Sequence, residues 1–170
     1  MTPLTARAKL RQALSEELVP VLRQSGFSGP ATISGNSLLH EYRRADGNFV
    51  QVLSIQLEKN QLPRFILIFH TEPAEGLERV MAGGGTVLTG CLKARPGPGL
   101  RSWFRADRSW WQRVVLRRSG TLEREAVRLC LACLPEVEAW WHSPAPSAHI
   151  DCWPVRYRST SAADGSRTRD

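Results

Sequence analysis

Apolar residues recur at every third or fourth position through the first part of the chain, which is the spacing of one helical face. The apolar face of a helix over residues 5–25 would carry Leu10, Leu14, Leu18, Val21 and Leu22. The nearby arginines expected largely off that face are Arg7, Arg11 and Arg23. Pro20 has no amide hydrogen to donate and should kink or split the helix, and Gly26 is the expected left-handed cap.

The middle of the chain changes to the alternating pattern that is typical of β-strands. Strands are expected at residues 38–44, 49–58, 64–70 and 86–95. Asp46-Gly47 lies between the first two and is a strong signal for a hairpin turn. Residues 29–36 are a further candidate for a short edge strand, and the helical period returns over residues 121–141.

This order of elements predicts an α+β fold: an antiparallel sheet of about four or five strands packed against N- and C-terminal helices on one face. We expect a single domain over residues 1–142. Residues 143–170 are rich in Pro, Ser, Ala, Gly and Arg, which predicts a disordered C-terminal tail.

Several short motifs follow one another in an order that suggests a family. They are Gly26-Phe27 at the end of a helix, Tyr42-Arg43-Arg44, Val50–Gln56, Gly90–Arg95 and Trp110-Trp111. Together they resemble the bacterial family called domain of unknown function 4304. The chain departs from that family at Ser54, where the family often has Asn, and in residues 83–99. The family has no established chemistry, so the resemblance implies no catalytic residue.

Composition places the chain among globular proteins. The 170 residues are 42% apolar, without an apolar run near the roughly 20 residues of a membrane helix. The first residues lack the apolar core of a secretion signal, so we expect a cytoplasmic protein with no membrane contact. Its four cysteines are then expected to be reduced thiols.

The net charge of +7 is concentrated in one segment. Residues 91–118 hold eight basic side chains and one acidic, whereas residues 1–90 hold nine and eight and residues 119–170 hold six and seven. Aromatic rings interleave with these arginines, as in single-strand nucleic-acid sites. The residues that would bind in such a site, within segment 93–118, are Arg101, Trp103, Arg105, Arg108 and Trp110. The alternative places the tryptophans in the core and the arginines in solvent.

A metal-like spacing occurs near the C-terminus, where two pairs of candidate ligands lie fifteen residues apart. They are Cys130 and Cys133, then His149 and Cys152. The first pair lies in a leucine-rich helical run without a glycine to bend a zinc knuckle, and buried cysteine behaves as a small apolar residue. We therefore expect core cysteines, no metal and no cofactor.

Polar side chains on the predicted hairpin are the remaining candidates. Gln56 interrupts an apolar strand and either satisfies a neighbouring loop or lines a pocket with Ser54, His40 and Tyr42. The sequence has no phosphate loop, nucleophile elbow, dinucleotide fingerprint or paired-carboxylate motif. These absences disfavour an enzymatic role without excluding one. We expect a non-catalytic binding module that recognises a protein or small ligand through the free face of the sheet, with nucleic-acid binding as the alternative.

Overall fold

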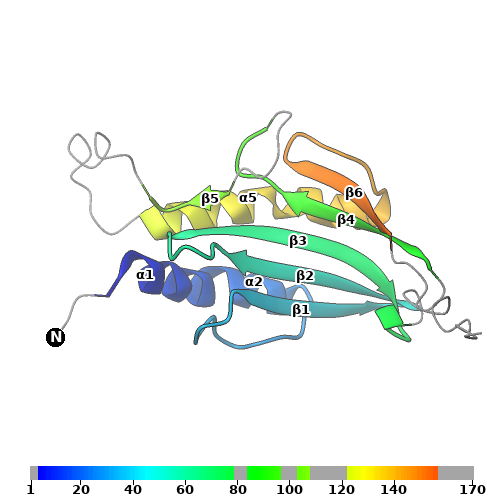
Figure 1. Ribbon diagram of the computed structural model, residues 1–170, viewed down its shortest axis with the longest axis horizontal. Helices are drawn as coiled ribbons and strands as arrows, with labels where there is room; N and C mark the ends of the chain where they lie inside the picture. Colours follow the sequence, from blue (N-terminus) through cyan, green and yellow to red (C-terminus); the bar gives the residue numbers. More distant parts are fainter. Residues whose placement is uncertain (1–3, 79–83, 97–102, 108–121, 157–170) are drawn as a thin grey trace, which may run out of the picture.

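The computed structural model describes residues 4–78, 84–96, 103–107 and 122–156 (Figure 1). Helices and strands occur in an order that starts with two short helices, continues through the sheet, and returns to a long helix and a last strand. Their bounds are α1 Ala6–Ala13, a π-helical turn Leu14–Leu18, α2 Val19–Gln24, β1 Leu39–Asp46, β2 Phe49–Leu57, β3 Arg64–Pro73, β4 Thr86–Leu92, β5 Phe104–Arg105, α5 Leu122–His142 and β6 Ile150–Arg156.

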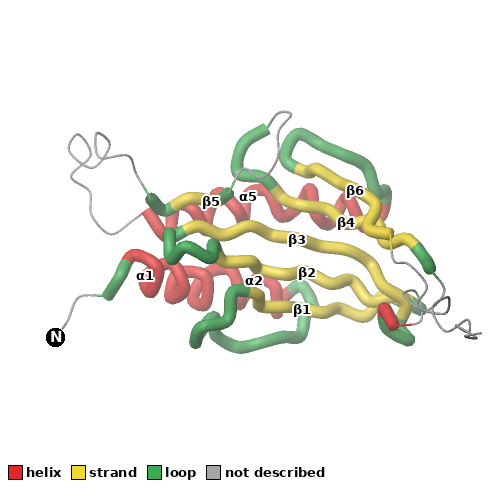
Figure 2. The backbone as a smooth tube through the Cα atoms, viewed as in Figure 1, coloured by secondary structure: helices red, strands yellow, loops and turns green. Residues whose placement is uncertain are grey.

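The strands form one antiparallel sheet in the order β1-β2-β3-β4-β6, and the short β5 pairs with β3. The helices α1, α2 and α5 lie together on one face of this sheet, and none of these three covers the other face, here called the helix-free face (Figure 2). The predicted α+β fold is therefore confirmed, with the two-residue β5 in addition to the five strands of the main path.

The N-terminal helix is distorted, but not ended, close to Pro20. Thr5 caps the first turn by accepting a hydrogen bond from the amide of Ala8 at 3.2 Å. One turn before Pro20 the helix widens to π geometry, in which the amide of Val19 donates to the carbonyl of Leu14. A wider turn gives the proline ring room beside the preceding carbonyls, so the helix continues past Pro20.

The predicted cap at Gly26 is confirmed. Gly26 has φ +88°, a conformation that residues with a Cβ rarely adopt. The amide of Phe27 donates to Leu22 and that of Gly26 donates to Arg23, which is the hydrogen-bond pattern of a Schellman motif. The cap turns the chain so that Phe27, only 3% exposed, packs into the core.

The core lies between the helices and the sheet, and β2 is buried on both of its faces: Val52 and Leu53, which point in opposite directions, are 0% and 1% exposed. On the helix side, Phe69 packs edge-on against Trp140 with ring centroids 5.0 Å apart. A Cβ on Gly90 would lie 2.2 Å from the Phe69 ring, so glycine is required for the ring to cross β4.

Two of the predicted elements are wrong. Residues 150–156 do not belong to a disordered tail, because they form β6 and pair with β4 along its whole length. Pro154 is compatible with this strand because β6 is the edge of the sheet. Residues 29–36 form no strand, and their neighbourhood contributes only an isolated bridge between Ser28 and Arg43. Residues 157–170 lie outside the described part of the chain.

Within the described ranges, no helix combines the length and the apolar character that crossing a bilayer demands.

We expect the Ile150→Ala variant to lose about 2–5 kcal/mol of unfolding free energy, because Ile150 is 1% exposed and truncation would leave a cavity in the core. Denaturant unfolding measures this loss. Pro154→Ala is the control on the same strand, since Pro154 is exposed. An Ile150→Ala loss below about 0.5 kcal/mol, the level of a surface change, would mean that β6 is not part of the cooperative core.

Candidate functional site

The hairpin register separates the candidate residues of β1 and β2. His40 pairs with Ile55 and Tyr42 pairs with Leu53, so both side chains face the helices. Gln56 pairs with Leu39 on the opposite, helix-free face, where it is half-buried. The prediction that Gln56 lines a pocket together with His40 and Tyr42 is therefore wrong. On β2, Gln56 is an odd number of residues away from the partners of His40 and Tyr42, so its side chain points to the opposite face of the sheet.

Tyr42 is a core residue that contacts the loop before β1. Its side chain is fully buried, and its hydroxyl donates to the carbonyl of Pro30 at 3.1 Å. Burial raises the pKa of Tyr42 to about 12, so the phenol stays protonated at neutral pH. A Cβ on Gly29 would lie 2.5 Å from the Tyr42 ring, which shows how closely the loop before β1 crosses it. Tyr42 thus anchors this loop onto the sheet.

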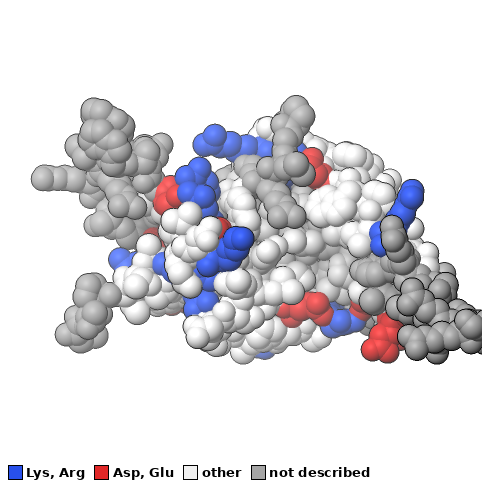
Figure 3. Space-filling model, in the orientation of Figure 1, with Lys and Arg blue, Asp and Glu red and all other residues white. Residues whose placement is uncertain are grey.

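The predicted nucleic-acid segment is described only in part. Trp103 is half-buried, Arg105 is exposed, and Arg101, Arg108 and Trp110 lie outside the described residues. Basic side chains gather around β5 on the face shown in Figure 3. Arg105 of β5 and Arg64 of the adjacent strand β3 both form ion pairs with Asp107. Burial alone would raise the pKa of Asp107, but hydrogen bonds from the two arginines lower it far below its usual value.

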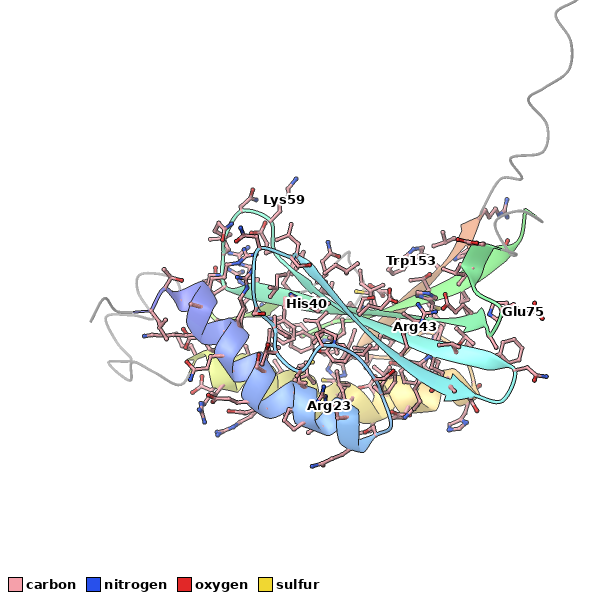
Figure 4. The ribbon with its side chains drawn as sticks, turned by 90° about the horizontal axis from the view of Figure 1, so that it is seen from below. Arg23, His40, Arg43, Lys59, Glu75 and Trp153 are labelled. Atoms are coloured by element: carbon pink, nitrogen blue, oxygen red, sulfur yellow. The ribbon has the colours of Figure 1, made fainter. Side chains whose placement is uncertain are left out.

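The helix-free face of the sheet carries a row of side chains that the register places side by side. From β1 to β6 the row consists of Arg43, Val52, His70, Thr89 and Trp153. Figure 4 shows Trp153 on the side of the sheet away from the helices. Arg43 forms ion pairs with Glu41 and with the buried Glu72, so its charge is already compensated. Burial lowers the pKa of the neighbouring His70 and favours its neutral form.

A pocket of about 380 Å³ opens on the helix side of the molecule, between α2 and α5. Val21 and Leu22 of α2 and Ser25 just after it form one wall, and Phe27 and Leu53 also line the pocket. The opposite wall comes from α5 and consists of Leu131, Leu134, Pro135, Val137, Glu138 and Trp141. The lining is therefore mainly aliphatic and aromatic, with Ser25 and Glu138 as polar members.

Arg44 lies beside this pocket and connects its walls. Its guanidinium carbon lies 4.4 Å from the ring centroid of Phe27 and 5.2 Å from that of Trp141, close enough for cation–π attraction. The same group donates to the carbonyl of Ser25 at 2.8 Å and pairs with Glu138 at 2.6 Å. Its Nε atom donates to Gln51, so one side chain contacts the ends of α2, α5 and the hairpin.

The alternation of side chains along β1 is a sequence signal for Arg44. Tyr42 and Arg44 alternate with Arg43 along β1, so Arg44 shares the core-facing side of the strand with Tyr42. A charged side chain in phase with buried residues indicates a partnered or functional group. The pocket itself could not be predicted, because its two walls come from helices about one hundred residues apart in the chain.

The cysteine and histidine residues with metal-like spacing are placed in the core and its margin. Cys130 and Cys133 are 0% and 6% exposed on α5, and Cys152 of β6 packs against the same core. Burial raises the pKa of the Cys130 thiol well above its usual value. Among the residues that the structure describes, no three His, Cys, Asp or Glu side chains form a group that could hold a metal ion.

His149 instead contacts Glu136 of α5, and this contact fixes the loop between α5 and β6 to the helix. Nδ1 of His149 lies 2.5 Å from the Glu136 carboxylate, which also accepts hydrogen bonds from the Ser147 hydroxyl and the His149 amide. Burial alone would raise the pKa of Glu136, but these hydrogen bonds outweigh it and lower the pKa.

Comparisons of the chain with family models, with curated proteins and with solved structures gave no match. The resemblance to domain of unknown function 4304 therefore stays a prediction, and the site has to be interpreted from its own chemistry.

We expect Arg44→Met to lower the unfolding free energy by about 2–4 kcal/mol, because the variant keeps the apolar stem but loses hydrogen bonds to three partners and the ring contacts. Arg128→Met is the matched control, since Arg128 is 68% exposed and lies 3.5 Å from Glu17. Denaturant unfolding compares both with the wild type. Equal effects of the two substitutions would show that Arg44 does not hold the elements together.

The lowered pKa of Glu136 makes its contribution to stability depend on pH. A carboxyl group whose pKa is lower in the folded state than in the unfolded state stabilises the fold at pH values above its unfolded-state pKa, which is near 4.5. This stabilisation is lost as the pH falls further. The difference in unfolding free energy between wild type and Glu136→Gln should shrink as the pH falls below 4.5, where the carboxylate of the wild type becomes protonated. A difference that does not shrink below this pH would contradict this arrangement.

Proposed function

We propose that the protein is a non-catalytic binding module that holds a small, mainly apolar ligand in the pocket between α2 and α5. The observation that carries this proposal is the pocket itself. Its volume of about 380 Å³ lies in the range of roughly 300–1,000 Å³ that is typical of small-molecule sites. Its lining of aliphatic and aromatic side chains with few polar groups has the composition expected of such sites.

The polar groups around the pocket define what the ligand should carry. The indole nitrogen of Trp141 is buried and has no hydrogen-bond partner among the described residues, but its burial also keeps it from contacting a ligand in the open pocket. Pro135 has no amide hydrogen, which leaves the carbonyl of Leu131 without its donor within α5. Glu138 is already paired with Arg44. These features favour an apolar body with one polar group.

The helix-free face of the sheet supports ligand binding less well. Its arginine is paired with two carboxylates, and Val52 and Ile66 are already 0% and 1% exposed, so a partner would gain little from contacting them. The nucleic-acid alternative depends mainly on residues outside the described part of the chain. Of its two described arginines, Arg105 is paired with Asp107, and Arg95 is exposed.

Binding of small apolar probes tests the proposal. Ligand-observed NMR with benzene, indole and octanoate should detect saturable binding to the wild type. Leu131→Phe places a larger side chain in the pocket and should weaken binding at least about tenfold, or about 1.4 kcal/mol. Leu129→Phe introduces the same ring on the same helix at a 45% exposed position outside the pocket and should bind as the wild type does.

Thermal unfolding of both variants verifies that each is folded. The proposal fails if the three probes do not bind, or if Leu131→Phe binds them as well as Leu129→Phe does. Tight binding of a single-stranded oligonucleotide that weakens with salt and is lost in Arg105→Ala would favour the alternative function instead.

A further inference from the structure

Two arginines of α1 and one histidine of β1 meet under the start of the sheet. Arg7 and Arg11 are four residues apart and so lie on the same side of the helix. His40 is on the helix-facing side of β1, and Figure 4 shows it between the sheet and the helix layer. Nη2 of Arg11 donates to the carbonyl of Ser37 at 3.4 Å, and His40 hydrogen-bonds the backbone of the same residue. Arg11 therefore lies near both of the others: it shares Ser37 with His40, and it is close enough to Arg7 to repel its charge.

Arg7 was expected off the apolar face of its helix, and the structure corrects this. Arg7 is 7% exposed, because it precedes Leu10 and Leu14 on the same buried stripe. Its Nη1 atom donates to the carbonyl of Glu58 at 2.5 Å. A guanidinium group has five N–H donors, so one backbone carbonyl satisfies only a fraction of them.

Several nitrogen atoms of this cluster are buried without a hydrogen-bond partner in the described structure. They are Nε and Nη2 of Arg7, Nε of Arg11 and Nε2 of His40. His40, like Arg7, is 7% exposed, so solvent does not compensate its ring nitrogen. A buried donor that lacks an acceptor destabilises a protein, and more so where it is charged. The three arginine donors therefore indicate that an acceptor belongs there, whereas Nε2 of a neutral His40 carries a lone pair and would accept a hydrogen bond from a protonated oxygen of the same ligand.

The charge of the cluster is also unbalanced. Burial lowers the pKa of Arg7, and repulsion from Arg11 lowers it further, while Glu58 partly offsets both effects. The carboxylate of Glu58 is itself engaged, because it accepts hydrogen bonds from Asn60 and from the amide of Leu62. A water molecule could accept hydrogen bonds here but could not reduce the repulsion between two guanidinium groups, whereas an anion would do both.

We propose that Arg7, Arg11 and His40 form a binding site for a small oxyanion, namely phosphate or the phosphate group of a larger ligand. The planar guanidinium fork matches phosphate oxygens in geometry as well as in charge. A tetrahedral oxyanion has enough oxygens to reach donors that approach from two elements at once, here α1 and β1. None of the three residues lines the pocket between α2 and α5, so this inference goes beyond the proposed function.

Thermal unfolding in inorganic phosphate tests the site. The midpoint of the wild type should rise by about 5 °C in 50 mM sodium phosphate at pH 7 relative to sodium chloride of equal ionic strength, because a ligand that binds only the folded state stabilises it. Arg7→Met and Arg11→Met should each lose most of this phosphate-specific rise. Arg23→Met is the control: it removes an exposed arginine of α2 that bonds the carbonyl of Gly29, and it should keep the full rise.

Arg11 is less buried than Arg7, so Arg11→Met provides the test if Arg7→Met does not fold. Calorimetric titration with inorganic phosphate and with methyl phosphate then identifies the source of the anion. Equal affinity for both indicates the phosphate group of a larger ligand, and binding of inorganic phosphate alone indicates the free ion. The proposal is overturned if phosphate stabilises the wild type no more than chloride does, or if Arg11→Met keeps the wild-type response.

Discussion

The contacts of Arg44 join three parts of the fold that lie far apart in the chain. Its guanidinium pairs with Glu138 of α5, donates to the carbonyl of Ser25 at the end of α2, and is joined to β2 through Gln51. Gln51 in turn donates to Asp46 at the end of β1. Positive charge at the C-terminal end of α2 also complements the helix dipole. Arg44 therefore adds polar contacts to the apolar core in fixing the two helices relative to the hairpin, and with them the pocket between the helices.

The π-helical turn solves a geometric problem in the N-terminal helix. Leu10, Leu14, Leu18 and Leu22 are spaced by four, and in a regular α-helix of 3.6 residues per turn such a series drifts about 40° with each step. Nevertheless each of the four is at most 2% exposed. The wider turn at Leu14–Leu18 reduces the drift and keeps the leucines on one line, and it also accommodates Pro20. One local distortion therefore serves both the core and the proline.

Local patterns in the sequence predicted the helices and the four strands β1 to β4, because their periods depend on neighbouring residues alone. The hairpin residues His40 and Gln56 were wrongly grouped because a pattern gives the period of each strand but not the phase between two strands. That phase is set by the turn, here Gly47 and Asn48, which makes His40 face Ile55. β6 was missed for a different reason: it is an edge strand containing Pro154, and its partner β4 lies some sixty residues earlier.

Both candidate sites contain an arginine where the pattern calls for an apolar residue. Arg7 is in phase with the leucines of α1, and Arg44 is in phase with Tyr42 on β1. A charge retained at such a position must be compensated by the fold or by a ligand, since burying it unpaired is strongly unfavourable. The fold compensates Arg44 through Glu138, Gln51 and Ser25. For Arg7 the fold supplies one backbone carbonyl, that of Glu58, and two of its nitrogen atoms stay without a partner in the described structure. Arg44 therefore helps to build a pocket, whereas Arg7 has donors left for an anion.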